Sequence, residues 1–600
     1  MIRMQSIINN NAFVGSVVHR KGAALLVVLF IVMAITILSL GFLSRSDVEL
    51  ACGRNMALRS QIDYLAESGL EHARGLILNP QDAASEYWTG DTAQQLVAGS
   101  DEYYDLDVVR DDSDPTDRCN YTIDCNAYRM DGGERIGLSE VTAQLRIDPC
   151  IALWVGTDVA VWNGMTVNGD VFCNGAIANS GAIDGDAFAD SLSGSSITGQ
   201  LKSVGDLSLV WPRVTVSDFI TNYATQSISS GTVSGQTFGP YNPVRVCYRN
   251  GNLILAGNVR IEGMLIVDGD LLVQGNRNVV TATKKCPALL VTGDLIVGSG
   301  GDFDVTGLAV VDGNVHINAG AANLSVLGGL FIRGECVETV GDASGHGNTG
   351  VIYGNPTWQP SGGQINGALR FDGQNDVVQD TSAGSYLNGL SGITFTAWIK
   401  SNVTNQDRDI MFTRTPTGAD QELGIRYDYS GASGGGVQGI KASIRTTSGF
   451  TQIESSSYAQ ATSWQHLALT WENDPNDSLL KLYINGTPDT LRYDMGPVYG
   501  TTAGVEKLMI GCGTKNCYWD GYIDDVRFYN RSLDAGEINV VRGGGAVAGL
   551  ICHWRLDESG SHIAVTAAPA KAAVEVWSST GDTQKWGQAA GAFFRSIERK

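Results

Sequence analysis

The hydrophobic positions of this chain form one long run near its start and many short runs afterwards. Residues 22–44 are 23 consecutive residues without a charge, enough to cross a bilayer as a helix of about 20 residues. Apolar or small residues then recur every three or four positions, as on one face of an amphipathic helix: Leu58, Ile62, Leu65, Gly69, Ala73 and Leu76. Pro80 ends the pattern. We expect one helix over residues 23–79, roughly 80 Å long, whose second half packs on a soluble head.

Residues 80–150 predict that head, a small α+β unit. Apolar and polar residues alternate over residues 120–130 and 137–147, on either side of a Gly132-Gly133 turn, which is typical of a β-hairpin. Upstream, four aspartates suggest a calcium loop: Asp111, Asp112, Asp114 and Asp117. Because no Glu follows at EF-hand spacing, a solvated acidic loop is the favoured interpretation.

A glycine-centred repeat runs through residues 151–335, in segments such as VNGDVF and VDGDLLV. Its central glycines are Gly169, Gly185, Gly269, Gly293, Gly313 and Gly328. A period of about 20 residues predicts stacked rungs of a parallel β-solenoid, because one rung alone cannot bury its apolar face. The Ser/Thr-rich residues 190–240 predict a long excursion from this stack.

Aspartates follow four of the repeat glycines: Asp170, Asp186, Asp270 and Asp294. Several carboxylates on one face could serve the cleavage of a polysaccharide. An aspartate at a β-turn more simply caps the backbone with its side chain. We favour capping.

From residue 341 to 542 the pattern changes to longer strands in which aromatic and aliphatic residues alternate. The runs GITFTAWIKS, WQHLALTWEN and GYIDDVRFYNRSL resemble strands of LamG or concanavalin A-like domains, in that family's order. The resemblance implies a two-sheet jelly roll, often a carbohydrate- or protein-binding module. The expected fold is therefore mostly β: a long N-terminal transmembrane helix, a parallel β-solenoid and a LamG-like β-sandwich.

The LamG resemblance also implies a calcium ion, because that family commonly holds one. Asp342, Asn348 and Asp525 match positions that could supply its oxygen ligands; alternatively, Asp342 and Asn348 merely shape a Gly-rich turn. Hydrolases of this fold need closely alternating carboxylates that include Glu. Asp520, Asp524 and Asp525 offer no Glu, so we expect no enzyme.

Residues 543–600 form a C-terminal strand and tail. The run GLICHWRLDESGS (549–561) resembles the first strand of a LamG domain, which normally precedes the rest. It either completes the jelly roll from the carboxyl end or returns to the stalk. The mildly basic tail of residues 586–600 either docks on the head or a partner, or is a frayed terminus.

Charge and cysteine content narrow the function classes. The net charge is −22, and residues 1–60 carry six basic and two acidic residues, so the acidic excess lies entirely beyond them. Such a surface repels phosphate backbones, and we expect no nucleic-acid partner. The 11 cysteines fit an oxidising compartment, and the pairs Cys119/Cys125 and Cys512/Cys517 are close enough in sequence to form disulfides.

The start of the chain resembles a type IV prepilin. The run HRKGAALLVVLF places basic residues and Gly22 before the apolar stretch, and AESGLEHARGLIL (66–78) resembles PilX-type minor pilins and GspK-type pseudopilins. The resemblance implies that a prepilin peptidase cuts after Gly22 and leaves Ala23 as the new terminus. Major pilins carry Glu at the fifth mature position, which here is Val27. This departure favours a tip, initiating or accessory subunit.

Together these patterns predict a bacterial inner-membrane protein that crosses once. The basic residues before the apolar run place the N-terminus in the cytoplasm, and the bulk periplasmic or surface-exposed. We expect a structural and adhesive accessory subunit of a type IV pilus or type II secretion pseudopilus, whose partners are other pilin or pseudopilin helices and a glycan or surface-protein ligand. The alternatives are a membrane-anchored polysaccharide-degrading enzyme and a single-pass surface protein unrelated to pili.

Overall fold

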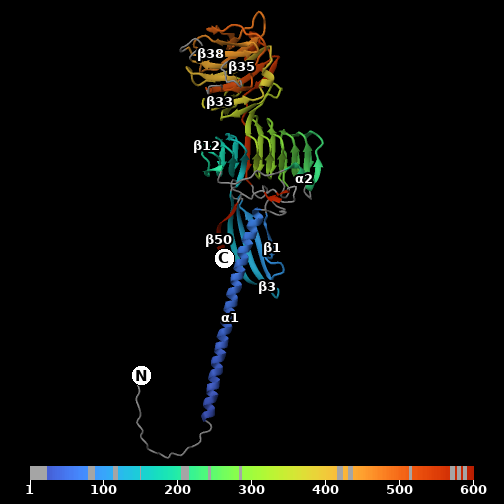
Figure 1. Cartoon of the computed structure of the whole chain (residues 1–600), viewed down its shortest axis with the longest axis vertical. Helices are drawn as coiled ribbons and strands as arrows, with labels where there is room; N and C mark the ends of the chain where they lie inside the picture. The colour runs from blue at the N-terminus through green and yellow to red at the C-terminus, as the bar shows by residue number, and fades with distance from the viewer. Residues whose placement is uncertain are drawn as a thin grey trace, which may run out of the picture.

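The computed structural model has four parts that follow one another along its long axis (Figure 1): a helix, a small sheet, a β-solenoid and a jelly roll. It describes residues 23–78, 88–111, 119–148, 150–204, 215–240, 245–282, 287–414, 423–429, 437–512, 517–567, 575–577, 583–585 and 591–599. The mostly β fold class predicted from the sequence is confirmed.

The long helix α1 spans Ala23–Leu78 and has 56 residues, as expected. Its first half is uncovered, with Phe42 74 % exposed, whereas Ile62 and Leu65 in its second half are buried against the head. Gly69 allows this close approach, because a Cβ there would lie 2.6 Å from Sγ of Cys125. In the described part of the chain α1 is the one helix long and apolar enough to cross a membrane.

The head is a five-stranded antiparallel sheet that packs on α1. Its strands, in spatial order, are β1 (Gly90–Gln94), β2 (Glu102–Arg110), β3 (Asn120–Asp131), β4 (Glu134–Asp148) and β50 (Gly591–Arg599). The predicted hairpin is β3–β4, and Gly132 and Gly133 turn it with φ of 59° and 94°. Asp112, Asp114 and Asp117 of the suggested calcium loop lie outside the described residues.

Three parallel faces form the solenoid. The first contains β13 (Leu201–Lys202), β11 (Ala187–Phe188), β8 (Asp170–Cys173), β5 (Ile151–Val155), β29 (Leu330–Ile332), β26 (Ala309–Val311), β23 (Leu289–Val291), β20 (Met264–Asp268), β17 (Arg245–Asn250) and β14 (Ala224–Ser227). The second contains β10 (Ala182–Asp184), β7 (Met165–Asn168), β47 (His562–Thr566), β28 (Asn323–Leu327), β25 (Asp302–Thr306), β22 (Asn278–Thr281), β19 (Arg260–Glu262) and β16 (Thr237–Phe238). The third contains β12 (Ser191–Gly194), β9 (Ala176–Asn179) and β6 (Val159–Val161), then β30 (Cys336–Val340), β27 (Val315–Asn318), β24 (Leu295–Val297), β21 (Leu271–Gln274), β18 (Leu253–Ala256) and β15 (Thr232–Val233).

The solenoid is wound from its middle rather than from one end. The chain enters at β5, builds outward to β13, and reappears at the opposite end at β14 after the short helix α2 (Val216–Asn222). It then winds back until β29 pairs with β5. The predicted excursion over residues 190–240 was therefore too wide, because β12 to β16 belong to the rungs themselves.

The aspartate side chains of the glycine repeat accept hydrogen bonds from backbone N–H groups of the next rung. They therefore cap the backbone, as the sequence predicts. Asp270 accepts the backbone N–H of Asp294 (3.0 Å), and Asp294 accepts that of Asn314 (2.7 Å). These residues lie at the corner that follows β20, β23 and β26, whereas Asp170 and Asp186 lie at the corner between β7 and β8 and between β10 and β11. The apparent single repeat of the sequence thus occupies two corners of the solenoid.

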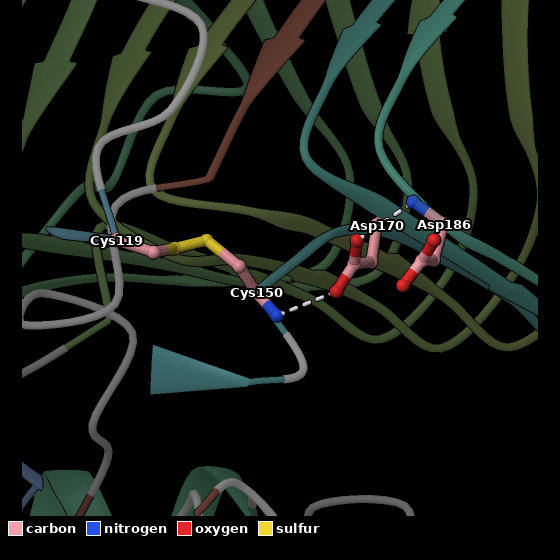
Figure 2. Close-up of a disulfide and its surroundings, with 4 residues drawn as sticks. All are labelled: Cys119, Cys150, Asp170 and Asp186. Atoms are coloured by element: carbon pink, nitrogen blue, oxygen red, sulfur yellow. Dashed lines mark hydrogen bonds between the residues drawn. A yellow bond between two sulfur atoms is a disulfide. The ribbon is translucent and has the colours of Figure 1, made fainter. Parts of the chain in front are cut away.

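A disulfide connects the head to the first rung of the solenoid. Cys119 at the start of β3 bonds to Cys150 just before β5, with their Cα atoms 6.2 Å apart. Figure 2 shows the Asp170 carboxylate beside it, where it accepts the N–H of Cys150 (2.7 Å) and that of Asp186 (2.9 Å). The predicted Cys119/Cys125 pair was wrong, because six residues of the extended strand β3 separate the two cysteines by about 20 Å.

The second predicted disulfide does not form either. Cys512 and Cys517 are not bonded to each other in the described residues, and Sγ of Cys517 lies 3.8 Å from a guanidinium nitrogen of Arg426.

The first sheet of the jelly roll is a continuation of the sheet that forms the third solenoid face. A second sheet packs against the jelly-roll part of this sheet. The first sheet follows β30 in the order β31 (Gly350–Tyr353), β34 (Val377–Asp380), β44 (Lys507–Ile510), β36 (Arg408–Arg414), β37 (Gly424–Asp428), β38 (Gly439–Thr446), β39 (Gly449–Glu454) and β43 (Tyr493–Asp494). The second contains β32 (Thr357–Gln359), β33 (Ala368–Asp372), β45 (Asp520–Tyr529), β35 (Gly392–Ser401), β40 (Gln465–Glu472), β41 (Lys481–Ile484) and β42 (Thr487–Pro488), with β46 (Leu550–Trp554) on β45. Two short helices, α3 (Gly384–Leu387) and α4 (Ala535–Arg542), complete it.

The C-terminal part of the chain returns through all three bodies in turn. Strand β46 pairs with β45 and completes the jelly roll, β47 fills a gap between β28 and β7 of the solenoid, and β50 pairs with β4 of the head. The short hairpin of β48 (Glu575–Trp577) and β49 (Thr583–Lys585) lies between the last two. The run 549–561 therefore completes the jelly roll, the first of the two alternatives, and the tail, which the sequence allowed to dock on the head, pairs with it through β50.

One buried carboxylate joins the jelly roll to the solenoid. Glu338 on β30 accepts the N–H and hydroxyl of Ser561 (both 2.7 Å) and the indole N–H of Trp358 (3.2 Å). The hydroxyl of Ser561 accepts the indole N–H of Trp162 in the solenoid (3.1 Å). The chain passes between the jelly roll and the solenoid twice, at β30 and again at Ser561. Glu338 links these two passages.

Candidate functional site

The three residues expected to hold calcium lie near one another, where β46 closes the jelly roll. The two carboxylate oxygens of Asp342 accept backbone N–H groups of Ser344, Asn348 and His553, at 2.9 to 3.0 Å. The side-chain amide of Asn348 donates to the carbonyl of Ile551 (2.7 Å). Asp342 and Asn348 thus shape the turn, which was the alternative weighed from the sequence.

The Asp525 carboxylate lies in a buried cluster of charged side chains and is not open to solvent. Its Oδ1 accepts from Nε2 of His553 (2.8 Å) and from the guanidinium of Arg527 (2.9 Å). Burial alone would raise the pKa of the Asp525 carboxyl, but the hydrogen bond from His553 and the charge of Arg527 outweigh it and hold this pKa below its ordinary value. Oδ1 of Asp525 is thus occupied by hydrogen bonds from His553 and Arg527.

Among the described residues, no three His, Cys, Asp or Glu side chains are placed to share a metal. Calcium binding by Asp342, Asn348 and Asp525 stays a prediction, and the chemistry considered below does not depend on it.

Asp524, the neighbour of Asp525, is also structural. Its Oδ2 accepts the backbone N–H groups of Gln364 and Ile365 (both 2.7 Å). Burial raises the pKa of the Asp524 carboxyl to about 8. Because its side chain is fully buried, it holds the loop that crosses β45 and does not face solvent.

An open row of aromatic and basic residues crosses the outer face of the second sheet, and we name it the aromatic strip. It comprises Arg370 on β33, Tyr522 on β45, Lys400 on β35 and Trp464 just before β40. Strand alternation places these side chains outside, because their neighbours Leu369, Ile523 and Ile399 fill the core. None of the four is buried.

The side chains of the strip contact one another directly. The rings of Trp464 and Tyr522 have centroids 6.1 Å apart, and Nζ of Lys400 lies 5.2 Å from the centroid of the Tyr522 ring. In the part of the chain that the structure describes, neither Arg370 nor Lys400 has a carboxylate partner. The strip therefore offers aromatic faces and two cations whose hydrogen-bond donors are available.

The next row on the same face supplies acceptors. Asp372 pairs in register with Asp520, whose carboxylate accepts a hydrogen bond from Nδ2 of Asn402 (2.8 Å). Asp372 is positioned by its loop, since the buried Asp376 carboxylate accepts the backbone N–H of Asp372 (2.8 Å) and that of Asn355 (2.6 Å). Burial raises the pKa of this Asp376 carboxyl to about 6.

This arrangement suits a ligand with apolar ring faces and many hydroxyl groups. Aromatic side chains bury an apolar surface with little loss of side-chain freedom. Cationic donors and carboxylate acceptors at the edge fix the orientation of hydroxyls by hydrogen bonds. A sugar ring has both kinds of surface.

The packing of the two sheets defines the class of this body, a concanavalin A-like jelly roll. A family profile described as "Concanavalin A-like lectin/glucanases superfamily" matches residues 372–539, which include four strip residues or neighbours of the strip: Lys400, Asn402, Trp464 and Tyr522. No curated protein matches the chain.

Several solved structures are similar to part of this chain at low sequence identity. Domain 4 of an extracellular arabinanase from Geobacillus stearothermophilus, in complex with arabinotriose, is 17 % identical over 34 % of this chain and 92 % of that one, with a TM-score of 0.25. A putative carbohydrate-binding protein from Bacteroides ovatus is 16 % identical over 39 % and 59 %, with a TM-score of 0.24. The binding domain of Paraclostridial Mosquitocidal Protein 1 is 15 % identical over 34 %, and the chain spans about half of its length (51 %), with a TM-score of 0.27.

The aromatic strip was missed from the sequence. The residues chosen there were Asp342, Asn348 and Asp525, and their side chains bond to backbone groups or to buried side chains of the protein itself. A signal did exist, because Tyr522 and Trp464 occupy strand positions whose alternation faces solvent, where large aromatics have no packing role.

Proposed function

We propose that this protein is an exported, membrane-anchored display protein that binds glycans through the aromatic strip. The observation that carries the proposal is the strip itself: Trp464 and Tyr522 are in contact on an open sheet face, flanked by Lys400 and Arg370, which have no carboxylate partner within the described ranges. The description of the matching profile, which names lectins and glucanases, supports the same ligand class.

The anchor is α1. Its first half has no protein surface against it, and its apolar run is long enough for a bilayer. In this proposal the preceding residues lie in the cytoplasm and the three β bodies lie outside the inner membrane. The Cys119–Cys150 disulfide supports an oxidising compartment for the head.

Within this class, an accessory pilin or pseudopilin is the finer proposal. A helix of 56 residues that packs by its second half on a small antiparallel sheet supports it. Prepilin peptidase would cut between Gly22 and Ala23, and the exposed half of α1 would then pack beside other pilin or pseudopilin helices. The leader residues lie outside the described residues, so this part rests on the sequence resemblance.

The proposal is for binding without turnover. Of the three aspartates considered for hydrolysis, Asp524 and Asp525 are committed to the backbone and to Arg527 and His553. Of these three, Asp520 alone faces the strip. Its cross-strand neighbour Asp372 is held by its own turn, because its two carboxylate oxygens accept hydrogen bonds from the backbone N–H and the side-chain amide of Gln374 (2.8 and 3.0 Å).

Two measurements on the full-length protein in detergent test the proposal. A glycan array should show binding that is weakened by Trp464→Ala, and incubation with the bound glycan should release no shorter products. Absence of binding would overturn the glycan proposal, and turnover would favour a polysaccharide-degrading enzyme.

Mass spectrometry of the mature protein tests the pilin part separately. We expect an N-terminus at Ala23, and a Gly22→Trp variant should keep its leader. A mature protein that still begins at Met1 would favour a single-pass surface protein unrelated to pili.

A further inference from the structure

Three loops meet at the end of the jelly roll next to the aromatic strip. The first loop, residues 402–407, leaves β35 after Ser401, the residue next to Lys400, and the second lies between β37 and β38, where the structure describes Tyr429, Val437 and Gln438. The third, residues 455–464, ends at Trp464 of the strip. Two of the three loops thus begin or end at the strip. We name their exposed residues Asp407, Tyr429 and Tyr458 the tyrosine rim.

A single buried amide holds the three loops together. Oε1 of Gln460 accepts the backbone N–H of Asn405 (2.9 Å), and Nε2 donates to the carbonyl of Gly439 (3.1 Å). The backbone N–H of Gln460 donates to the carbonyl of Gln438 (3.1 Å). Because Gln460 is only 6 % exposed, water competes little for these bonds, and the loops form one unit.

Each loop also contains a strained residue. Asn405, Gln438 and Tyr458 have φ of 62°, 50° and 66°, in the left-handed region that non-glycine residues avoid. Such conformations are strained and gather at binding sites and ligand clamps. For a bulky residue such as Tyr458 the conformation is exceptional, and it turns the side chain away from the sandwich.

The rim presents aromatic rings to solvent. Tyr458 is 73 % exposed and Tyr429 is 44 % exposed. Their backbones are joined through Val437, whose N–H donates to the carbonyl of Tyr429 (3.2 Å) and whose carbonyl accepts the N–H of Tyr458 (2.8 Å). Asp407 lies beside them, since its Oδ1 accepts the N–H of Tyr429 (2.8 Å) and Arg426 lies 3.7 Å from its other oxygen.

We propose that the tyrosine rim is a further subsite of the aromatic strip, and that the ligand is an extended oligosaccharide or polysaccharide chain bound along both. This inference rests on the proposed function and specifies its ligand class. Like the strip, the rim presents exposed rings beside a carboxylate. The Arg426 guanidinium is buried and paired with Asp407 and Asp409, so it positions Asp407 and does not face the ligand. Tyr458 and Trp464 are six positions apart on one loop, so even a fully extended chain keeps them within roughly 20 Å, a distance that a short oligosaccharide spans.

The test is a length series of the glycan selected on the array, from the monosaccharide to the hexasaccharide, titrated against the full-length protein in detergent. The affinity of the wild type should rise with chain length. Tyr458→Asn, which keeps a residue that tolerates positive φ, should lower the affinity for the long ligands about tenfold, as expected for loss of an aromatic contact, and leave that for the shortest ligand unchanged. Tyr429→Ala should act in the same direction.

The matched control is Tyr499→Ala, because Tyr499 is 47 % exposed and lies beside Thr446 at the opposite end of β38; it should change nothing. If affinity does not depend on chain length, or if Tyr458→Asn and Tyr429→Ala bind every length like the wild type while Trp464→Ala weakens all of them, the subsite is wrong and the proposed function stands. Absence of any binding overturns both.

Discussion

Two groups of charged residues occupy the outer face of one jelly-roll sheet and do different things. Around His553, Asp525 and Arg527, every charge is buried and has a partner inside the protein. Around Tyr522, the cations Arg370 and Lys400 face solvent without a carboxylate partner in the described chain. The first group closes the fold, because β46 arrives from the far end of the jelly roll and must be held. Only the second can exchange water for a ligand.

The largest effect is expected from breaking the buried group. Asp525→Ala should destabilise the jelly roll by about 3–5 kcal/mol, because it leaves Arg527 buried without its counter-charge. Denaturant unfolding of the full-length protein, followed by tryptophan fluorescence, measures it. Unfolding that matches the wild type would show that the cluster does not hold β46.

Removing a ring of the strip should affect binding and not stability. Trp464→Ala should weaken glycan affinity roughly tenfold to a hundredfold, as for loss of a central aromatic contact. The unfolding midpoint should stay close to that of the wild type, since Trp464 is not part of the core. If Trp464→Ala lost stability and affinity together, the strip would have a structural role like that of the buried Asp525 group, and the comparison would be wrong.

The pH dependence of stability separates the buried Asp524 from the half-buried Asp520. The pKa of Asp524 is raised from 3.8 to about 8 by burial, so the folded state keeps a proton that the unfolded state has lost. Its contribution is complete below the unfolded pKa and declines until pH passes about 8. Burial lowers the pKa of His466 to about 3, and this opposing contribution acts only below the ordinary histidine pKa of about 6.5.

Stability should therefore fall between about pH 6.5 and 8, and Asp524→Asn should flatten that decline. Thermal unfolding at several pH values measures both, with Asp520→Asn as the control that keeps the wild-type slope. An unchanged slope in Asp524→Asn would contradict the assignment.

The smallest expected effect concerns one hydrogen-bond acceptor of the strip's edge. Asp520→Asn should lower glycan affinity by only a few-fold, because one exposed hydrogen bond is worth about 1 kcal/mol. Calorimetric titration with the array-selected glycan would detect it. A complete loss of binding would instead give Asp520 a central role.

Regular patterns in the amino-acid sequence predicted most of the fold. The apolar run and its three-and-four spacing predicted α1 over its full length, and alternation around Gly132-Gly133 predicted β3–β4. The glycine repeat predicted the solenoid because each rung repeats the same local turn. It could not show that the winding begins at β5 in the middle, since parallel rungs look alike whether the chain moves outward or back.

Long-range pairings could not be read from local spacing. Cys119 bonds to Cys150 and not to Cys125, because six residues of extended chain along β3 separate Cys119 from Cys125 by about 20 Å. The return of the C-terminal segment to three successive bodies likewise depends on sheet edges that only the assembled fold exposes. The candidate site needed both sheet register and alternation, because Arg370, Lys400 and Tyr522 come from three distant strands.

The most direct test of the account is a structure of the full-length protein with the array-selected glycan bound. We expect a sugar ring stacked on Trp464 and Tyr522, with its hydroxyls within hydrogen-bond reach of Lys400 and Arg370. A glycan bound instead at the turn of Asp342 and Asn348, with the strip empty, would contradict it.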